Sequence, residues 1–225
     1  MTPAFDAVIF DCDGVLTDTE GVAEEVALRM LAAEGLHYTP AESQRFVGLA
    51  ARAWSDLVEK EALDRLGRPL PQGTMARISA AISEAILRDV RAIPGAVAAV
   101  NAIRLPKGVA SSSPTFELHG KMRALGLWDV LDPHIHGGDD VAHAKPAPDL
   151  YLLAADRLKV APSRCLVIED SVPGVTAGVA AGMTVWGFTG GPHLPAGTQS
   201  RLVRAGAVRY FDAMADLPGL LLQRG

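Results

Sequence analysis

The sequence predicts an α/β protein in which a parallel sheet is interrupted, after its first strand, by a bundle of helices. Short apolar runs rich in β-branched residues end in polar or turn residues at several points of the chain. From residue 91 onward these runs alternate with helical segments, which is typical of βαβ units. No strand signal interrupts the helical patterns between residues 20 and 88. We therefore expect a Rossmann-like core domain at 1–17 and 91–225, and a helical domain at 18–90.

The first strand is predicted at Ala7–Phe10, and two aspartates follow it directly. Asp11 and Asp13 precede Gly14, so both carboxylates should lie at the carboxyl end of the strand, where open parallel sheets bind ligands. Two carboxylates about 4 Å apart repel by roughly 4 kcal/mol at an effective dielectric constant near 20. A divalent cation would turn this cost into binding energy, and oxygen ligands favour a hard ion. The pair therefore predicts a Mg²⁺ site.

Four helices are predicted in the inserted segment, each from apolar residues at helical spacing. Gly35 is placed to end the first helix, and Thr39–Glu42 has the spacing of a capping box with proline at the first helical position. Gly48 is expected to close the second helix, and Gly67 the third. The apolar faces are predicted at Val22, Val26, Met30 and Ala33 in the first helix, at Trp54, Leu57, Val58 and Ala62 in the third, and at Met75, Ile78, Ile82 and Ile86 in the fourth.

Two later strands also end in chemically active residues. The apolar run at 108–110 is followed by three serines, of which Ser113 is expected to cap the helix that begins near Pro114. The run at 166–168 is followed by Glu169 and Asp170. Further strands are predicted at 183–188 and 208–211. The carboxyl ends of parallel strands meet at one edge of a sheet, so these groups are expected to lie near Asp11.

Composition limits the classes of function. A chain of 225 residues that is 49% hydrophobic can bury a sizeable core, and its net charge of −5 provides no basic face for nucleic acid. Cys12 and Cys165 are too few for a disulfide framework and fall in predicted strands, so we expect buried thiols in a reducing compartment. No signal peptide or membrane-spanning run is apparent. These features predict a cytoplasmic protein without nucleic-acid or membrane partners.

Four segments in order resemble the haloacid dehalogenase (HAD) superfamily of aspartyl-nucleophile phosphatases. Within it, the likeness is to the subfamily of phosphoglycolate phosphatase and β-phosphoglucomutase, whose core sheet carries an inserted helical cap. The order and spacing of the segments cover nearly the whole chain. The matching segments are Phe10–Asp18, Ala110–Ser112, Lys145–Pro146 and Ile168–Ser171.

The resemblance implies a two-step hydrolysis of a phosphate monoester. Asp11 would attack the phosphorus to form an aspartyl-phosphate, which splits one difficult displacement into two easier ones. Asp13 would protonate the leaving alcohol and then activate the water that hydrolyses the intermediate. Lys145 would pair with Asp11 and the phosphoryl group. The three residues are the predicted catalytic residues.

The resemblance also implies the ligands of the metal and of the phosphoryl group. The expected ligands of Mg²⁺ are the Asp11 side chain, the Asp13 backbone carbonyl, the Asp170 side chain, and Glu169 directly or through water. The ion would orient the phosphoryl oxygens and neutralise charge. The expected phosphate-binding residues are Ser111, Ser112 and Gly14, and Arg52 of the helical domain is a candidate contact for the rest of the substrate.

The substrate is expected to be a small phosphorylated metabolite of the sugar phosphate or phosphoglycolate type, because a helical cap that closes leaves little room. One alternative is a phosphomutase like β-phosphoglucomutase. That enzyme has a histidine shortly after the first motif, where this chain has Gly21–Glu24, and its cap arginine lies one position nearer the glycine than Arg52. The other alternative is a non-catalytic protein that senses metal and phosphate.

Three histidines lie close together in the sequence, at positions 134, 136 and 143, and invite a comparison with zinc sites. Their spacing matches no compact zinc site, and the first two flank a residue in a predicted short strand. We therefore expect them to have structural roles.

Overall fold

Two compact units make up the chain in the computed structural model, which describes residues 4–46, 51–192, 194–195 and 197–223, without the side chains of residues 40, 44, 51 and 52. One unit, the α/β core, comprises Met1–Asp18 and Val90–Gly225, and the other, the helical unit, comprises Thr19–Asp89. The sequence analysis placed the boundaries after residues 17 and 90. Within the described residues, no helix is long and apolar enough to cross a membrane.

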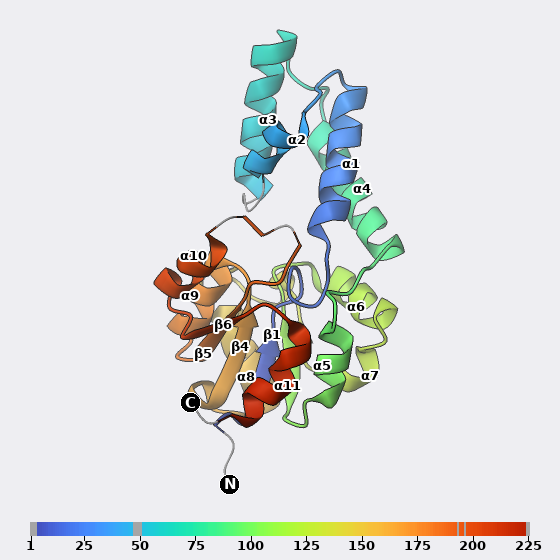
Figure 1. Cartoon of the computed structure of the whole chain (residues 1–225). Coiled ribbons are helices and arrows are strands. Elements are labelled where there is room, and N and C mark those ends of the chain that lie inside the picture. The colour runs from blue at the N-terminus through green and yellow to red at the C-terminus, as the bar shows by residue number, and fades with distance from the viewer. Residues whose placement is uncertain (1–3, 47–50, 193, 196, 224–225) are drawn as a thin grey trace. The chain divides into compact units, whose positions relative to one another are not determined.

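A six-stranded parallel sheet forms the centre of the α/β core (Figure 1). Its strands lie in the order β3-β2-β1-β4-β5-β6, so β1 is central and the strand order reverses beside it. This is the point at which open α/β sheets bind ligands. The predicted α/β fold class is therefore confirmed. The strands are β1 (Ala7–Phe10), β2 (Lys107–Ala110), β3 (Ile135–His136), β4 (Cys165–Glu169), β5 (Thr184–Phe188) and β6 (Arg209–Phe211).

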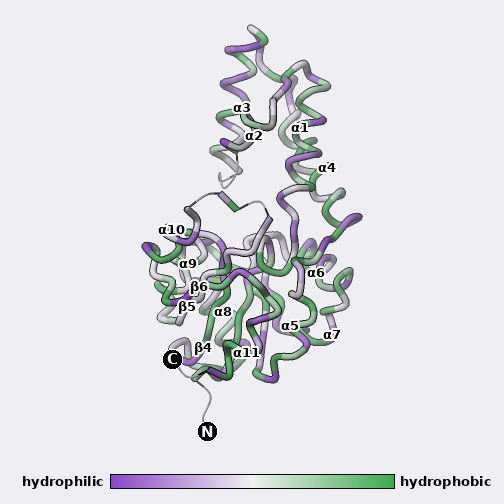
Figure 2. The backbone as a smooth tube through the Cα atoms, in the orientation of Figure 1, coloured by the Kyte–Doolittle hydropathy of each residue, from purple (hydrophilic) through white to green (hydrophobic). Residues whose placement is uncertain are grey.

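Both faces of the sheet are covered by helices, and alternate residues of each strand supply the two apolar layers. Val8 and Phe10 of β1 belong to one layer, whereas Ala7 and Ile9 belong to the other. The hydrophobic colouring of Figure 2 follows the strands accordingly. The first layer packs against α5 (Ala96–Ala102), α6 (Thr115–Ala124), α7 (Trp128–Leu131) and α11 (Leu217–Leu222), and the second against α8 (Asp149–Leu158), α9 (Val172–Ala180) and α10 (Thr198–Ala205).

The helical unit has its own apolar core. It consists of α1 (Glu20–Ala33), α2 (Pro40–Ser43), α3 (Ala51–Leu66) and α4 (Thr74–Arg88), with a 3₁₀ turn at Gln44–Phe46. The predicted capping box is confirmed, because the Thr39 amide donates to Glu42 Oε2 at 2.7 Å and the Glu42 amide donates to Thr39 Oγ1 at 3.3 Å. The buried residues of this core are Ala27, Leu31, Leu36, Val58, Ala62 and Ile78.

Part of the predicted apolar face of α1 is wrong. Ala33 is exposed, and Leu31, which was not predicted, is fully buried. The cause is the short side chain of Ala33 in the last turn, where Leu31 and Leu36 fill the core instead. Cys12 also lies just beyond β1 rather than in it, although its thiol is buried as expected. Gly48 falls outside the described residues.

The chain leaves the α/β core and returns to it at adjacent points. Thr17 forms an isolated antiparallel bridge with Ala92, and the Asp18 amide donates to the Arg91 carbonyl at 2.9 Å. The Ile93 amide also donates to the Leu16 carbonyl at 2.9 Å. The two connecting segments are therefore joined by backbone hydrogen bonds on the core side of the insertion.

Candidate active site

Three buried carboxylates gather at the carboxyl ends of the two central strands. Asp11 follows β1, while Glu169 ends β4 and Asp170 follows it; each of the three residues is at most 8% exposed. One carboxylate oxygen from each residue lies within 4.8 Å of the other two. The pairing of Phe10 with Ile168 aligns the two strand ends, and the Asp11 amide donates to the Ile168 carbonyl at 3.0 Å. In the described part of the chain, this is the one cluster of His, Cys, Asp or Glu suited to a metal ion.

Lys145 lies against this cluster, from the loop before α8. Its Nζ atom is 2.6 Å from Asp11 Oδ1, 2.8 Å from Glu169 Oε1 and 3.0 Å from the Ala110 carbonyl oxygen. Each ammonium proton therefore has an acceptor. Lys145 pairs with two of the three carboxylates, and its single charge balances only one of them.

Burial and charge act in opposite directions on the titration of this cluster. Burial raises the pKa of Asp11 to about 7, and Glu169 and Asp13 add to that rise against the attraction of Lys145. Burial alone would lower the pKa of Lys145, but the neighbouring Asp11 and Glu169 raise it well above its usual range. Lys145 therefore stays charged beside a carboxyl group whose ionisation is costly.

Glu169 is held by two residues that the sequence analysis did not assign to the site. The Tyr151 hydroxyl of α8 donates to Glu169 Oε1 at 2.9 Å. The Ser171 amide and hydroxyl donate to Glu169 Oε2 at 2.9 and 2.8 Å. Ser171 also caps α9, because its Oγ accepts the Gly174 amide at 3.1 Å. The position of Ser171 before a proline-containing helix start could have indicated the cap, whereas nothing in the sequence marks Tyr151.

Two glycines leave the space that the carboxylates occupy. Gly14 has a φ of +84°, and a Cβ atom there would overlap Asp170 Oδ2. A Cβ atom on Gly174, in the first turn of α9, would overlap Glu169 Oε1. Gly14 was predicted to bind the phosphoryl group, and the structure shows that the missing side chain leaves room for the Asp170 carboxylate.

Asp13 does not join the acidic cluster with its carboxylate, which accepts hydrogen bonds from four side chains instead. Its Oδ1 atom is 2.7 Å from Lys121 Nζ and 3.3 Å from Thr17 Oγ1. Its Oδ2 atom is 2.8 Å from Ser113 Oγ and 3.1 Å from Ser111 Oγ. The metal ligand expected from Asp13 was the backbone carbonyl, so this arrangement leaves that prediction open.

Ser113 has a different role from the one predicted. Pro114 occupies the N-cap position of α6, and the first amide of that helix, at Thr115, donates to Asp139 Oδ1 at 2.7 Å. The Ser113 hydroxyl instead donates to Asp13, 100 residues earlier in the chain. The expectation of a helix cap was wrong because the helix begins one residue later than a Ser113 cap requires, and the Ser113 hydroxyl bonds a charged acceptor instead.

Lys121 is the main charged residue that the sequence analysis missed. It lies in α6, is 1% exposed, and contacts Glu117 Oε1 of the same helix at 2.7 Å in addition to Asp13. Its sequence position, between helical residues far from any motif, resembles that of an ordinary surface lysine.

The predicted phosphate-binding residues lie in the loop after β2. Ser111 is buried, and its amide donates to the His136 carbonyl at 3.1 Å. Ser112 is exposed beside it. Arg52 belongs to α3, but its side chain lies outside what the structure describes.

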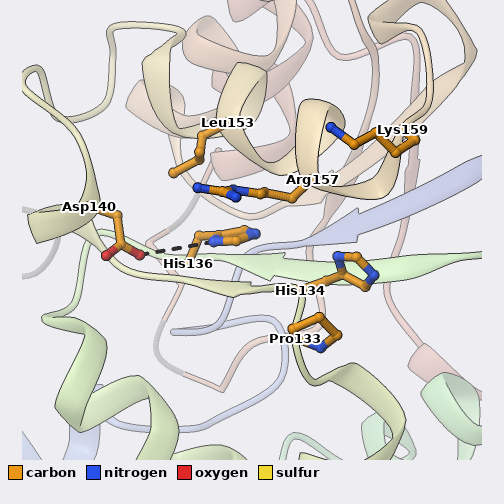
Figure 3. A pocket seen from close by; sticks show the side chains of 7 residues that line it. All are labelled: Pro133, His134, His136, Asp140, Leu153, Arg157 and Lys159. Carbon is orange, nitrogen blue, oxygen red and sulfur yellow. Dashed lines mark ion pairs between the residues drawn. The ribbon is translucent and has the colours of Figure 1, made fainter.

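A separate cavity of about 470 Å³ lies beside β3 and α8 (Figure 3). His136 faces Asp140 across 4.0 Å, and burial lowers the pKa of its imidazole against the pull of that carboxylate. His143, by contrast, pairs with Asp149 at 2.8 Å. His136 and His143 thus contact separate carboxylates. The cavity is lined by Pro133, His134, His136, Asp140, Leu153, Arg157 and Lys159.

Comparison with known families identifies the class of protein. The model of the haloacid dehalogenase-like hydrolases matches residues 5–182, so the chain belongs to this family. The fold and the acidic cluster agree with that membership. The chain is an enzyme, a phosphatase of the HAD type.

Individual relatives cover most of the chain. It is 29% identical to 6-phosphogluconate phosphatase of Escherichia coli K12, over 98% of this chain and 96% of that protein. It is 31% identical to a phosphorylated carbohydrates phosphatase of Thermotoga maritima, over 79% and 82% of the two chains. Among solved structures, a HAD family hydrolase from Deinococcus radiodurans R1, with bound phosphate and sodium, is 36% identical and superposes with a TM-score of 0.81 over 99% of this chain and 100% of that one.

Proposed function

We propose that this chain is a Mg²⁺-dependent phosphatase that hydrolyses a small phosphorylated metabolite, of the sugar phosphate or phosphoglycolate type, through an aspartyl-phosphate on Asp11. The observation that carries the proposal is the position of Asp11. Its carboxylate lies at the switch point of the sheet, 2.6 Å from Lys145 and within 4.8 Å of two further carboxylates.

The donor set of the cluster fits magnesium. Three buried carboxylates lie together and Lys145 pairs with two of them, so the negative charge that remains suits a divalent cation. All of the candidate ligand atoms are hard oxygens. The residues that would hold the ion are Asp11, Asp170 and the Asp13 carbonyl, with Glu169 binding directly or through water. When bound, the ion orients the phosphoryl oxygens and offsets the charge of the attacked group.

In the proposed first step, an oxygen of Asp11 forms a bond to phosphorus as the bond to the leaving alcohol oxygen breaks. The Asp13 carboxyl group gives its proton to that oxygen, and the alcohol departs. In the second step, Asp13 accepts a proton from water, whose oxygen attacks phosphorus and releases phosphate from Asp11. One group serves both steps because losing the proton in the first makes it a base for the second.

Lys145 would supply positive charge beside the nucleophile and hold the Asp11 carboxylate in a fixed orientation. Its contacts to Asp11, Glu169 and the Ala110 carbonyl support the orienting role. We assign phosphoryl binding to Gly14 and to the two serines Ser111 and Ser112. The serines lie in the loop after β2, at the same edge of the sheet.

The substrate class is supported by the relatives, two of which are named as phosphatases of 6-phosphogluconate and of phosphorylated carbohydrates. We propose that the helical domain at 18–90 acts as the cap of this core at 1–17 and 91–225. A cap that closes over the site would exclude water and favour compact substrates. Arg52 is our candidate for a contact to the substrate from this domain.

The test is phosphate release from a panel of phosphorylated metabolites, with Mg²⁺ or with a chelator, by the wild type and Asp11→Asn. We expect magnesium-dependent release that Asp11→Asn abolishes while its circular dichroism spectrum stays that of the folded protein. Glucose 1-phosphate with a bisphosphate primer tests the mutase alternative, and isomerisation with little release would replace our proposal. Tight Mg²⁺-dependent binding of phosphate without turnover of any ester would favour the sensor.

A further inference from the structure

Lys121 is a fully buried cation behind the proposed acid-base residue. Its side chain is 1% exposed, and its Nζ atom lies 2.7 Å from Asp13 Oδ1, 2.7 Å from Glu117 Oε1 and 3.1 Å from Ser113 Oγ. Lysine is almost never fully buried unless its charge is paired. All three ammonium protons have acceptors here, so the geometry of the group is fixed.

Among the four side-chain hydrogen bonds that the Asp13 carboxylate accepts, the one from Lys121 is the shortest. Lys121 reaches Oδ1 directly and also donates to the Ser113 hydroxyl, which in turn donates to Oδ2. It therefore acts on both oxygens of the carboxylate. Charge-assisted hydrogen bonds are shorter and roughly twice as strong as neutral ones, so Lys121 has the largest influence on the orientation of Asp13 among these donors.

We propose that Lys121 is the positioning residue of Asp13, and that it thereby sets the rate at which the leaving alcohol is protonated. The inference rests on the proposed function, in which Asp13 gives that proton. Lys121 acts through Asp13 and is not itself a catalytic residue.

Removing the ammonium group would have two consequences for Asp13. The carboxylate would lose its shortest contact, and it would then face Glu117 across the space that the shared nitrogen had occupied. The two anions repel at such a distance, so Asp13 would turn away. A misplacement of about 1 Å at a reacting group can cost on the order of 100-fold in rate.

The test compares two classes of ester in Lys121→Met. The fastest alkyl phosphate of the metabolite panel needs a proton on its leaving oxygen, whereas 2,4-dinitrophenyl phosphate releases a stable anion without one. The ratio kcat/KM covers only the steps through loss of the leaving group. We expect kcat/KM to fall by about 100-fold for the alkyl ester, as for a displaced general acid, and by less than about threefold for the aryl ester.

Arg123→Met is the matched control, because Arg123 is an exposed cation two positions along the same helix and lies over the Trp128 ring. We expect it to leave both ratios unchanged. In an Asp13→Asn background, Lys121→Met should add no more than about a twofold further loss, since both substitutions remove one function. If Lys121→Met does not fold, Lys121→Met with Glu117→Gln relieves the repulsion between carboxylates and should show the same preference between esters.

Equal losses on the two esters, or an additive loss in the Asp13→Asn background, would overturn the positioning role. These outcomes are separate from failure of the proposed function. If Asp13→Asn itself spares the alkyl ester, the acid-base assignment is wrong. If Asp13→Asn impairs the alkyl ester selectively and the folded Lys121 variant does not, only the inference about Lys121 fails.

Discussion

At the scale of single residues, Asp11 combines a nucleophile's position with an unfavourable environment for charge. It is 7% exposed and has two acidic neighbours within 4.8 Å, with Lys145 as the opposing cation. Burial raises its pKa to about 7, so without metal the folded protein holds a proton on Asp11 more tightly than the unfolded chain does. A group of this kind lowers stability as pH rises.

The sign of this linkage gives a prediction for Asp11→Asn in the presence of a chelator. The ionised Asp11 carboxylate destabilises the folded protein. This loss of stability begins as the pH rises above the unfolded pKa of 3.8 and is complete above the folded pKa of about 7. Asp11→Asn should therefore be more stable than the wild type at pH 8, and its advantage should shrink by on the order of 2 kcal/mol at pH 5. Denaturant unfolding at both pH values measures this, and an advantage independent of pH would contradict it.

The site residues that the sequence could predict are those that lie next to an apolar strand in the chain. Apolar runs are directly followed by Asp11 and Asp170, or end in Glu169. Once such a run forms a buried parallel strand, these residues must lie at its carboxyl end. Lys121 and Tyr151 come from helices, where only tertiary packing decides which side chains reach the site. Nothing local distinguishes them from surface residues.

At the scale of elements, α9 couples helix formation to the acidic cluster. Ser171 accepts the Gly174 amide as an N-cap and donates two hydrogen bonds to Glu169. The same residue therefore begins the helix and orients a proposed metal ligand. Sequence patterns predicted the helices of the helical unit more firmly than their buried faces, as Ala33 and Leu31 of α1 illustrate, because packing against neighbouring elements decides which apolar residues of a helix are covered.

Ser171→Ala and Thr39→Ala test this coupling as a matched pair. Each removes a capping hydroxyl, and each should destabilise its unit by about 1 kcal/mol. Only Ser171→Ala should weaken Mg²⁺ binding, by about 10-fold, because it also removes a hydrogen bond from Glu169. Isothermal titration with Mg²⁺ and thermal unfolding give the two quantities. Equal Mg²⁺ affinities in the two variants would contradict the second role of Ser171.

At the scale of the whole molecule, the described buried residues give each of the two units an apolar core of its own. The core of the helical unit is built from residues of that unit alone, around Leu31 and Val58, while the sheet supplies the two layers of the α/β core. All of the proposed metal ligands belong to the α/β core. Metal binding should therefore act on one unit.

Hydrogen exchange with and without Mg²⁺, in the absence of substrate, checks this expectation. The metal stabilises the state that binds it, so amides of β1 and β4 should exchange more slowly when it is present. Amides inside α1 and α4 should be unaffected. Equal protection of both units by Mg²⁺ alone would show that metal binding also orders the helical unit. A chelator added afterwards should restore the original rates.

The helical unit is inserted into the α/β core through two connecting segments that are hydrogen-bonded to each other. Thr17 bridges Ala92, and Asp18 is hydrogen-bonded to Arg91, so the core presents two neighbouring chain ends to whatever lies between them. Evolution could exchange the inserted segment there without disturbing the strand ends that carry the chemistry. Under the proposed cap role, a laboratory chimera joined at the same two positions should take on the donor's substrate preference and retain this chain's hydrolytic machinery.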